Sequence, residues 1–170
     1  MSTYKIVVTG PFNSGKTEFV RNGSDIDIVA TEKSITTEDR GIKALTTVAM
    51  DFGRSETNSD RVHLFGTPGQ ARFAFMWEIL AREMNGFIVL VDATDPPSFP
   101  DAAELVETFS SFVDVPYMLV ANKVDLPEAV GIDEIRKAIG IDSAVPIMEC
   151  VATDKTRVRA VVDKMLALIQ

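Results

Sequence analysis

Eight residues near the N-terminus, Gly10 to Thr17, constrain most strongly what this chain can fold into. They spell Gly-Pro-Phe-Asn-Ser-Gly-Lys-Thr, a complete G-x-x-x-x-G-K-T phosphate loop. The apolar run Ile6-Val7-Val8 precedes the loop, and a short helical segment follows it. Because a strand before and a helix after are the context in which this motif cradles phosphates, a chance glycine-rich turn is the weaker interpretation. The sequence therefore predicts an N-terminal unit that binds a nucleoside triphosphate.

The loop offers a phosphate chain several favourable contacts. Its backbone N–H groups must turn inward around the anion, which Gly10 and Gly15 permit, and Asn13 tolerates the same left-handed geometry. The N-terminus of the following helix adds partial positive charge. Lys16 is expected to reach the terminal phosphates, and the hydroxyl of Thr17 is expected to bind Mg²⁺. These residues predict a magnesium nucleotide without selecting its base.

Length and charge exclude several classes of protein. The 170 residues suit a single domain over 1–170, long enough to bury a core without disulfides. A net charge of −8, with no basic run, argues against binding to a nucleic-acid backbone. The single cysteine, Cys150, cannot form an internal disulfide, which favours the cytoplasm. No signal sequence, membrane-length apolar run, myristoylation site or prenylation site is present, so no direct lipid anchor is expected.

Short apolar runs alternate with amphipathic segments along the chain. This order predicts an α/β fold in which helices cover both faces of a mostly parallel sheet. Strands are expected at 4–9, 43–54, 61–65, 86–92, 116–121 and 145–150, helices at 15–21, 71–84, 99–113, 133–139 and 156–169, and a long loop at 22–37. Since only a short turn joins the second and third strands, they are expected to be antiparallel. The prediction is a three-layer α/β/α domain with six strands and one antiparallel pair.

A second motif, Asn122-Lys123-Val124-Asp125, directly follows the expected strand 116–121. Ligands of open α/β sheets bind at the carboxyl ends of strands, which brings this motif to the edge that carries the phosphate loop. A carboxylate at Asp125 can accept hydrogen bonds from both guanine N1–H and the exocyclic amine, and adenine has no such donor pair. Asn122 and the stem of Lys123 would hold the loop and cover the base. A solvated turn is the weaker alternative, and GTP or GDP is the expected nucleotide.

With both motifs in place, the chain resembles a Ras-like small GTPase from end to end. The stretch Thr47 to Phe52 is similar to the start of the second strand in Rab-type members. The stretch Gly66 to Phe73 is similar to the Rab switch II sequence Asp-Thr-Ala-Gly-Gln-Glu-Arg-Phe. Among prokaryotic members the best resemblance is to the MglA type, which also has a proline before the switch II glycine and lacks the usual acidic residue. The resemblance implies the P-loop NTPase G-domain fold.

The resemblance also implies roles for individual residues. Thr17 and Thr47 would bind Mg²⁺, Gln70 would orient the attacking water, and Lys16 would act in catalysis as well as binding. The Ala152 N–H would face guanine O6, although 149–153 matches the family's Ser-Ala-Lys motif mainly by position. The full nucleotide-binding set would comprise Gly10, Asn13, Ser14, Gly15, Lys16, Thr17, Thr47, Gly69, Asn122, Lys123, Asp125, Val151, Ala152 and Thr153.

The expected function is a molecular switch that hydrolyses GTP to GDP and phosphate with Mg²⁺. Without a stabilising arginine the intrinsic rate should be on the order of 10⁻⁴ to 10⁻³ per second. A GTPase-activating or regulatory partner, of the roadblock type by resemblance, would stimulate it, and effectors would bind switches I and II. The protein is expected to be a monomer or weak dimer. The alternative is a non-cycling nucleotide-binding module, and Asp125 argues against a small ATP-dependent kinase.

Three departures from the family pattern bear on hydrolysis. Gly66 stands where the family has a magnesium-organising aspartate, so Asp51 or, less favoured, Asp92 could substitute for it, unless these carboxylates only form ion pairs or face solvent. Phe12 stands where Ras has glycine, and it would either obstruct Gln70 or an incoming arginine, or pack into the core. Arg40 and Arg72 are candidates for an arginine acting in cis, although surface roles are favoured for both.

Further expectations concern the segments around the two switches. Residues 22–46 are longer than in Ras, which predicts a switch with an insertion. On the helix after switch II, Phe75 and Ile79 would form a docking patch if exposed. His63 and Cys150 are expected to be structural. Helical spacing predicts core positions at Phe73, Met76, Trp77, Leu80, Val158, Val161, Val162, Met165 and Ile169.

Overall fold

A computed structural model describes residues 1–39, 42–57, 59–68 and 74–170, and for 29–49 it describes the backbone alone. The strands are β1 Ser2–Thr9, β2 Val29–Asp39, β3 Ile42–Glu56, β4 Asp60–Gly66, β5 Gly86–Asp92, β6 Tyr117–Asn122 and β7 Ile147–Glu149. The helices are α1 Lys16–Gly23, α2 Ala74–Ala81, α3 Phe99–Phe112, α4 Ile132–Ile139 and α5 Lys155–Ile169, with a short 3₁₀ turn at Pro96–Ser98.

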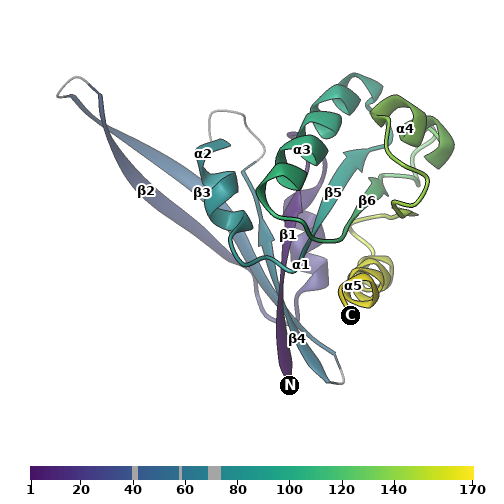
Figure 1. Cartoon of the computed structure of the whole chain (residues 1–170), viewed down its shortest axis with the longest axis horizontal. Coiled ribbons are helices and arrows are strands. Elements are labelled where there is room, and N and C mark those ends of the chain that lie inside the picture. Colours follow the sequence, from purple (N-terminus) through teal and green to yellow (C-terminus); the bar gives the residue numbers. More distant parts are fainter. Residues whose placement is uncertain (40–41, 58, 69–73) are drawn as a thin grey trace.

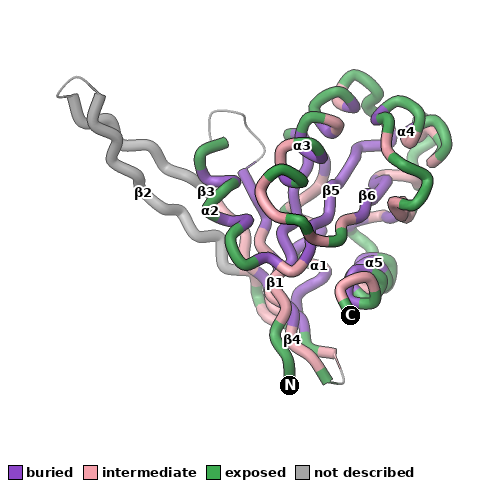
Figure 2. Tube along the Cα trace, in the orientation of Figure 1, coloured by how far each residue is buried: buried purple, intermediate pink, exposed green. Residues whose placement is uncertain are grey.

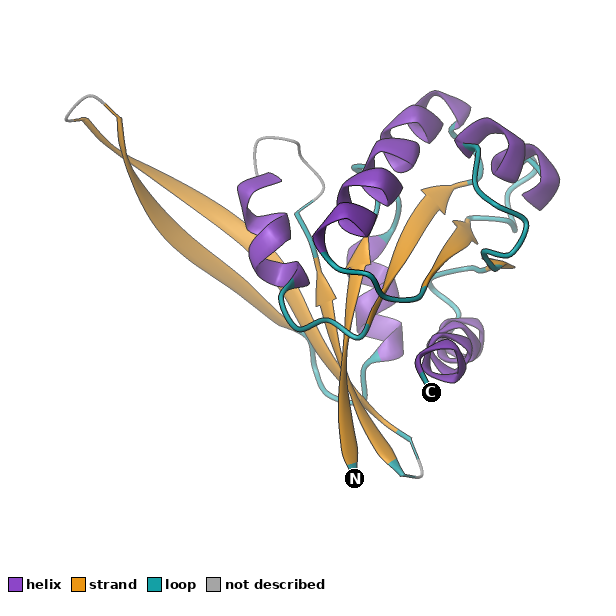
Figure 3. Ribbon diagram, in the orientation of Figure 1, coloured by secondary structure: helices purple, strands orange, loops and turns teal. Residues whose placement is uncertain are grey.

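The expected three-layer α/β/α architecture is confirmed (Figures 1 and 3). The strand order is β2-β3-β4-β1-β5-β6-β7, and all pairs from β4 to β7 are parallel. Alternate residues of β1 point to opposite sides, so that Ile6 and Val8 pack with α1 and α5, whereas Val7 packs with α2 and α3. Strand β5, next to the central strand β1, is buried along its whole length (Figure 2).

The prediction of a long loop over 22–37 is wrong from Val29 onward. Residues Val29–Asp39 form β2, which pairs antiparallel with Ile42–Phe52 of β3. The sheet therefore has seven strands instead of six, and β3 is antiparallel to both of its neighbours. Only the last part of β3, from Asp51 to Glu56, also pairs with β4, so β2 and the first part of β3 extend as a ribbon beyond the body (Figure 1). The segment contains several β-branched residues, but no clean alternation marked it as a strand.

Most of the expected core positions are confirmed. Met76, Trp77 and Leu80 of α2 are buried, and so are the expected valines and Met165 of α5, whereas Ile169 is partly buried. Phe73 lies outside the described residues. Phe75 and Ile79 are each 48% exposed on the other side of α2, as the spacing allowed. Among the described segments, none forms a helix long and apolar enough to cross a bilayer.

Candidate functional site

The phosphate loop connects the end of β1 to the start of α1. Asn13 and Gly15 both have left-handed backbone geometry, with φ angles of 65° and 102°. Glycine is also needed at position 15 for steric reasons, because a Cβ on Gly15 would lie 2.3 Å from Nδ2 of Asn122. The close approach of these two residues joins the phosphate loop to the motif that follows β6.

The ammonium group of Lys16 is folded over this loop. Its Nζ donates hydrogen bonds to the carbonyl oxygens of Gly10 and Pro11, at 2.8 and 3.0 Å. Burial lowers the pKa of Lys16 to about 8, although Asp51 partly opposes this shift. Among the ion pairs of the described residues none involves Lys16. A buried cation with no paired carboxylate is suited to an anionic ligand such as a phosphate.

One buried amide, that of Asn122, connects three loops. Its Nδ2 donates to the carbonyl oxygen of Ser14 at 2.8 Å, and its Oδ1 accepts from the backbone N–H of Ala152 at 2.9 Å. Asn22 adds a bond from its own Nδ2 to the carbonyl oxygen of Ala152, at 2.8 Å. The phosphate loop, the loop after β6 and the loop before α5 are therefore fastened together at the carboxyl edge of the sheet.

Lys123 adds a second connection between the same loops. Its Nζ donates to the carbonyl oxygen of Asn13 at 3.0 Å and pairs with Oδ2 of Asp92 at 2.8 Å. Burial opposes ionisation of Asp92, but hydrogen bonds from Lys123 and Thr94 hold the pKa of Asp92 below its ordinary value. Asp92 thus holds Lys123, which links the phosphate loop to the loop after β6. Among the described residues, Asp92 shares no hydrogen bond with Thr17.

These loops surround a pocket of about 200 Å³. Asp125 and Leu126 line it on one side, and 151–153 line it on the other. The Ala152 N–H, expected to face guanine O6, donates to Asn122 in this structure, so a base would have to share that donor or displace the amide. The pocket combines an exposed carboxylate with a mostly apolar wall, which suits a planar base with two adjacent donors.

The side of the site expected to hold the metal is built around Thr17 and Asp51. The Thr17 hydroxyl donates to Oδ2 of Asp51 at 2.7 Å. Asp51 is the cross-strand partner of Gly66, and a Cβ on Gly66 would lie 3.2 Å from the Cβ of Asp51. The Asp51 side chain on β3 therefore lies close to the place where the side chain of the family's aspartate would project from β4.

The donors at this position fit magnesium better than a metal that needs a full protein cage. Within the described ranges, no three His, Cys, Asp or Glu side chains gather as a metal cluster. The protein offers one hydroxyl and one carboxylate, and Mg²⁺ typically takes one or two carboxylates together with waters and substrate phosphates. Thr17 and Asp51 are consequently the residues that fit such an ion.

The structure does not bring Thr47 to this position. Thr47 lies on β3 opposite Ser34, four residues before Asp51, which corresponds to about 13 Å of strand. Its expected contact with Mg²⁺ would require β3 to be rearranged. The predictions for Gly69, Gln70, Arg72 and Arg40 concern residues outside the described ranges.

The beginning of switch II is held by contacts that sequence reasoning missed. The Thr67 N–H donates to the carbonyl oxygen of Val8 at 3.0 Å, and its hydroxyl donates to that of Thr9 at 2.9 Å. The indole N–H of Trp77 donates to the carbonyl oxygen of Pro68 at 3.0 Å. A buried tryptophan normally finds a hydrogen-bond partner for its N–H. The expected burial of Trp77 was therefore the sequence signal for such a contact.

Phe12 is 63% exposed in the phosphate loop, and the hypothesis that it packs into the core is wrong.

Cys150 is buried, and burial raises the pKa of its thiol to about 11, which agrees with an inert cysteine. Burial, together with Arg61 and Arg54, lowers the pKa of His63.

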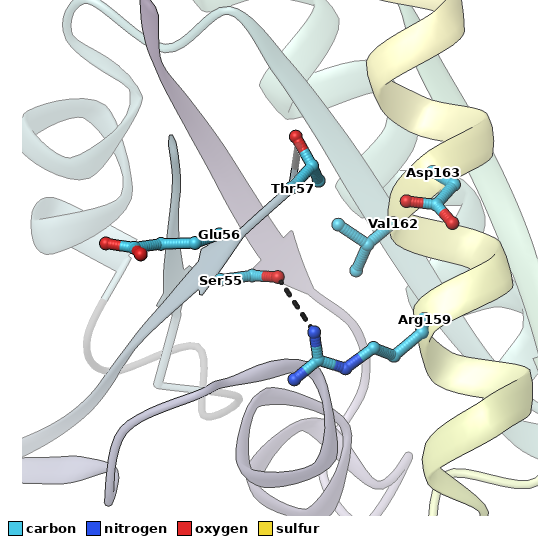
Figure 4. Close-up of a pocket in the computed structure, with 6 residues that line it drawn as sticks. All are labelled: Ser55, Glu56, Thr57, Arg159, Val162 and Asp163. Carbon is cyan, nitrogen blue, oxygen red and sulfur yellow. Dashed lines mark hydrogen bonds between the residues drawn. The ribbon is translucent and has the colours of Figure 1, made fainter. Parts of the chain in front are cut away.

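A second pocket, of about 270 Å³, lies at the opposite edge of the sheet (Figure 4). Arg159 of α5 reaches across it toward the Ser55 hydroxyl at 3.5 Å and also pairs with Asp25. Ser55 lies in the part of β3 that pairs with the beginning of β4, far from the phosphate loop at the end of β1. These contacts fasten α5 to β3, so this pocket is assigned to the packing of the fold.

The fold and both loops match one family. The sequence pattern of the Ras family matches residues 5–170, almost the whole chain. The chain belongs to the Ras family. Its members are small GTPases that bind GTP and GDP, and the phosphate loop and Asn122-Lys123-Val124-Asp125 lie where a shared nucleotide could contact both.

Several relatives agree with this family membership. The chain is 34% identical over 122 residues to the uncharacterized protein MJ1339 of Methanocaldococcus jannaschii, covering 72% of this chain and 71% of that protein. It is 27% identical over 144 residues to human ADP-ribosylation factor-related protein 1, covering 79% and 66%. It is 29% identical over 133 residues to Ras-related protein RABD2a of Arabidopsis thaliana, covering 74% and 66%. The chain thus spans slightly less than two thirds of the human and plant relatives, and the archaeal relative agrees with a prokaryotic-type Ras-like GTPase.

Proposed function

We propose that residues 1–170 form one G domain that acts as a GTP-dependent switch, hydrolysing GTP slowly with Mg²⁺ until a partner protein stimulates it. The observation that carries this proposal is the junction at Asn122, which joins the phosphate loop to the loop beside the base pocket through bonds to Ser14 and Ala152. A ligand that contacts both loops needs a base at one end and phosphates at the other. Asp125 in the pocket selects guanine for the base.

In this proposal each side chain has a defined task. Lys16 leaves the carbonyls of its own loop and pairs with the terminal phosphates, which restores the charge that burial disfavours. Thr17 and Asp51 would hold the metal with a hydroxyl and a carboxylate. Mg²⁺ would neutralise charge that develops on the phosphates during transfer. Gln70 is proposed to orient the attacking water.

Regulation by partners is proposed from the exposed surface near the switches. Phe12 of the phosphate loop and Phe75 and Ile79 of α2 are exposed, and large apolar side chains of this kind commonly mark docking surfaces. A regulatory partner, of the roadblock type by resemblance to MglA-type proteins, would act here, and effectors would bind the same switches. The protein itself is proposed to be a cytoplasmic monomer or weak dimer.

A second candidate is a module that holds nucleotide without cycling. The position of Thr47, about 13 Å of strand before Asp51, favours it, because the switch threonine is then away from the metal side. Gly66 favours it too, since the family's aspartate is missing. The two candidates predict the same nucleotide but different turnover.

The decisive experiment identifies the nucleotide that copurifies and then follows its hydrolysis with and without Mg²⁺. The switch predicts GDP or GTP, with Mg²⁺-dependent turnover of GTP on the order of 10⁻⁴ to 10⁻³ per second without a partner. Bound ATP would contradict the assignment to guanine. Bound GTP that never turns over, with candidate partners present, would favour the non-cycling module.

The role of Gln70 needs its own variant. Gln70→Ala should abolish partner-stimulated hydrolysis while leaving the Kd for GTP within about twofold, because the glutamine acts on the water and not on the bound nucleotide. Stimulated turnover that survives in this variant would remove Gln70 from the mechanism.

A further inference from the structure

A groove of about 630 Å³ lies between α3 and α4, on the side of the sheet opposite α5. Apolar and polar atoms contribute about equally to its lining, and its volume falls in the range typical of ligand sites. The apolar side chains that form its floor come from α3, from the start of β6 and from the end of α4: Pro100, Ala103, Val106, Tyr117, Ile139 and Ile141. None of them belongs to the phosphate loop, the base loops or the switches.

The rim of this groove is acidic. Glu104 and Glu107 are exposed on α3, three residues apart and therefore on one side of the helix, and Asp142 is exposed beyond the end of α4. In the described part of the chain none of these three carboxylates forms an ion pair. Two carboxylates on one wall and one on the other surround the apolar floor.

Arg136 and Lys137 form no ion pair with this rim among the described residues. Arg136 uses its Nη1 to donate to the carbonyl oxygens of Asp142 and Val145, at 2.7 and 2.9 Å, so it holds the loop backbone after α4. Lys137 is exposed on α4 but does not line the groove. The Asp142 carboxylate also accepts a hydrogen bond from the Ala144 N–H at 2.8 Å, so Glu104 and Glu107 carry most of the negative charge that a ligand from solvent can meet.

Tyr117 adds a polar group to the floor. Its ring stacks on Phe87 with centroids 4.8 Å apart and an interplanar angle of 5°, which fixes its position. Burial and the nearby Asp142 raise the pKa of Tyr117, so the phenol keeps its proton at neutral pH. Its hydroxyl has no hydrogen-bond partner among the described residues, which leaves a fixed donor and acceptor at the groove.

We propose that this groove binds a positively charged amphipathic helix of a partner protein, in either nucleotide state. Apolar side chains of the helix would pack on the floor between Ala103 and Ile141, and its lysines or arginines would pair with Glu104, Glu107 and Asp142. Helices pack on other helices by interdigitation of side chains, so walls formed in part by α3 and α4 can accept a third helix. Because no lining residue contacts the proposed nucleotide site, the affinity does not depend on whether GDP or GTP is bound.

The test uses the full chain and a synthetic helical peptide of leucine and lysine, fluorescein-labelled, with leucines along one face. A second peptide of the same length has glutamate in place of lysine. Fluorescence anisotropy should give a micromolar Kd for the lysine peptide, equal within twofold in protein loaded with GDP or with a non-hydrolysable GTP analogue. The glutamate peptide should bind at least tenfold more weakly.

Variants separate this groove from the general acidity of the chain. Glu104→Lys/Glu107→Lys should weaken binding of the lysine peptide at least tenfold. The matched control Glu128→Lys/Asp163→Lys makes the same change in net charge at exposed positions outside the groove and should have little effect. Ala103→Phe, which fills the floor without changing charge, should weaken binding about fivefold. Thermal unfolding and nucleotide retention report whether each variant folds.

Four results would overturn the proposal. An equal loss in the control variant would mean non-specific attraction to an acidic protein. Equal binding of both peptides, or binding that changes with the nucleotide, would exclude the charge-selective and state-independent site. Concentration-dependent self-association that Ala103→Phe abolishes would assign the groove to a second copy of this chain. None of these outcomes bears on GTP hydrolysis, so the proposed function stands or fails separately.

Discussion

The two halves of the proposed nucleotide site are organised differently. On the base side, Asn122 and Lys123 already join three loops through side-chain hydrogen bonds to Ser14, Ala152 and Asn13. On the metal side, the structure shows one contact, between Thr17 and Asp51, and Thr47 lies away from it. The half that would select the nucleotide is thus preorganised, whereas among the described residues the half that would hold the metal has Thr17 and Asp51 in contact but not Thr47.

This difference suits a switch. A ligand that must be retained benefits from a preorganised contact surface, because little entropy is lost on binding. A terminal phosphate that must be sensed benefits from segments that it orders only when present. Substitutions in the two halves should therefore affect different measurements, and this is how the comparison can be tested.

The largest effect is expected for Asp125→Asn in the base pocket. Replacing the carboxylate removes charge-assisted hydrogen bonds worth about 1.5–3 kcal/mol each, so GTP should bind about 10³-fold more weakly. Xanthine carries a carbonyl where guanine carries its amine, and the new amide can donate to it, so xanthosine triphosphate should bind the variant better than the wild type. Competition against a labelled GDP gives both constants. An unchanged Kd for GTP would place the base elsewhere.

The next effect is expected for Asn122→Ala at the junction. It leaves the Ser14 carbonyl and the Ala152 N–H buried without their partner, and each such group costs about 1–3 kcal/mol. The free energy of unfolding without nucleotide should fall by about 2–4 kcal/mol, measured by urea denaturation. Asn22→Ala is the control, since it removes only bonds to the carbonyl oxygens of Glu18 and Ala152, which can accept from water instead. Equal losses in both variants would argue against a preorganised junction.

On the metal side, Asp51→Ala should weaken Mg²⁺ binding about 10- to 100-fold, the range for lost groups that orient a metal. The measurement is the dissociation rate of labelled GDP as a function of Mg²⁺ concentration. The double variant Asp51→Ala/Gly66→Asp returns a carboxylate to the strand where the family has it and should restore part of the dependence. A Mg²⁺ dependence that is unchanged in Asp51→Ala would exclude the substitution of one aspartate for the other.

The smallest effect concerns pH and Lys16, which lies between the two halves. In the protein without nucleotide its pKa is lowered to about 8, and phosphates favour the ammonium form, so binding takes up a proton above this pH. The Kd for GTP should therefore rise about fivefold between pH 7.5 and 8.8. This range stays below that in which guanine loses its own proton. Lys16→Ala should bind more weakly but show no such rise, and an equal rise in that variant would assign the titration to another group.

Much of the fold could be predicted from the sequence because its signals are local. The apolar run of β5 and the spacing of Met76, Trp77 and Leu80 on α2 depend on neighbouring residues alone, and both predictions are confirmed. The strand Val29–Asp39 could not be predicted in this way. Its residues show no clean alternation of apolar and polar types in the sequence, and its strand structure is defined by its pairing with β3.

The sequence by itself determined the family and the kind of ligand proposed, because the phosphate loop and Asn122-Lys123-Val124-Asp125 each encode their chemistry within a few consecutive residues. Only the tertiary structure decided which carboxylate meets Thr17. The antiparallel register of β3 and β4 places Asp51 opposite Gly66, and the missing side chain of the glycine leaves space for it. Register is a property of two strands together, so residues far apart in the chain acquire a shared role only when the sheet has formed.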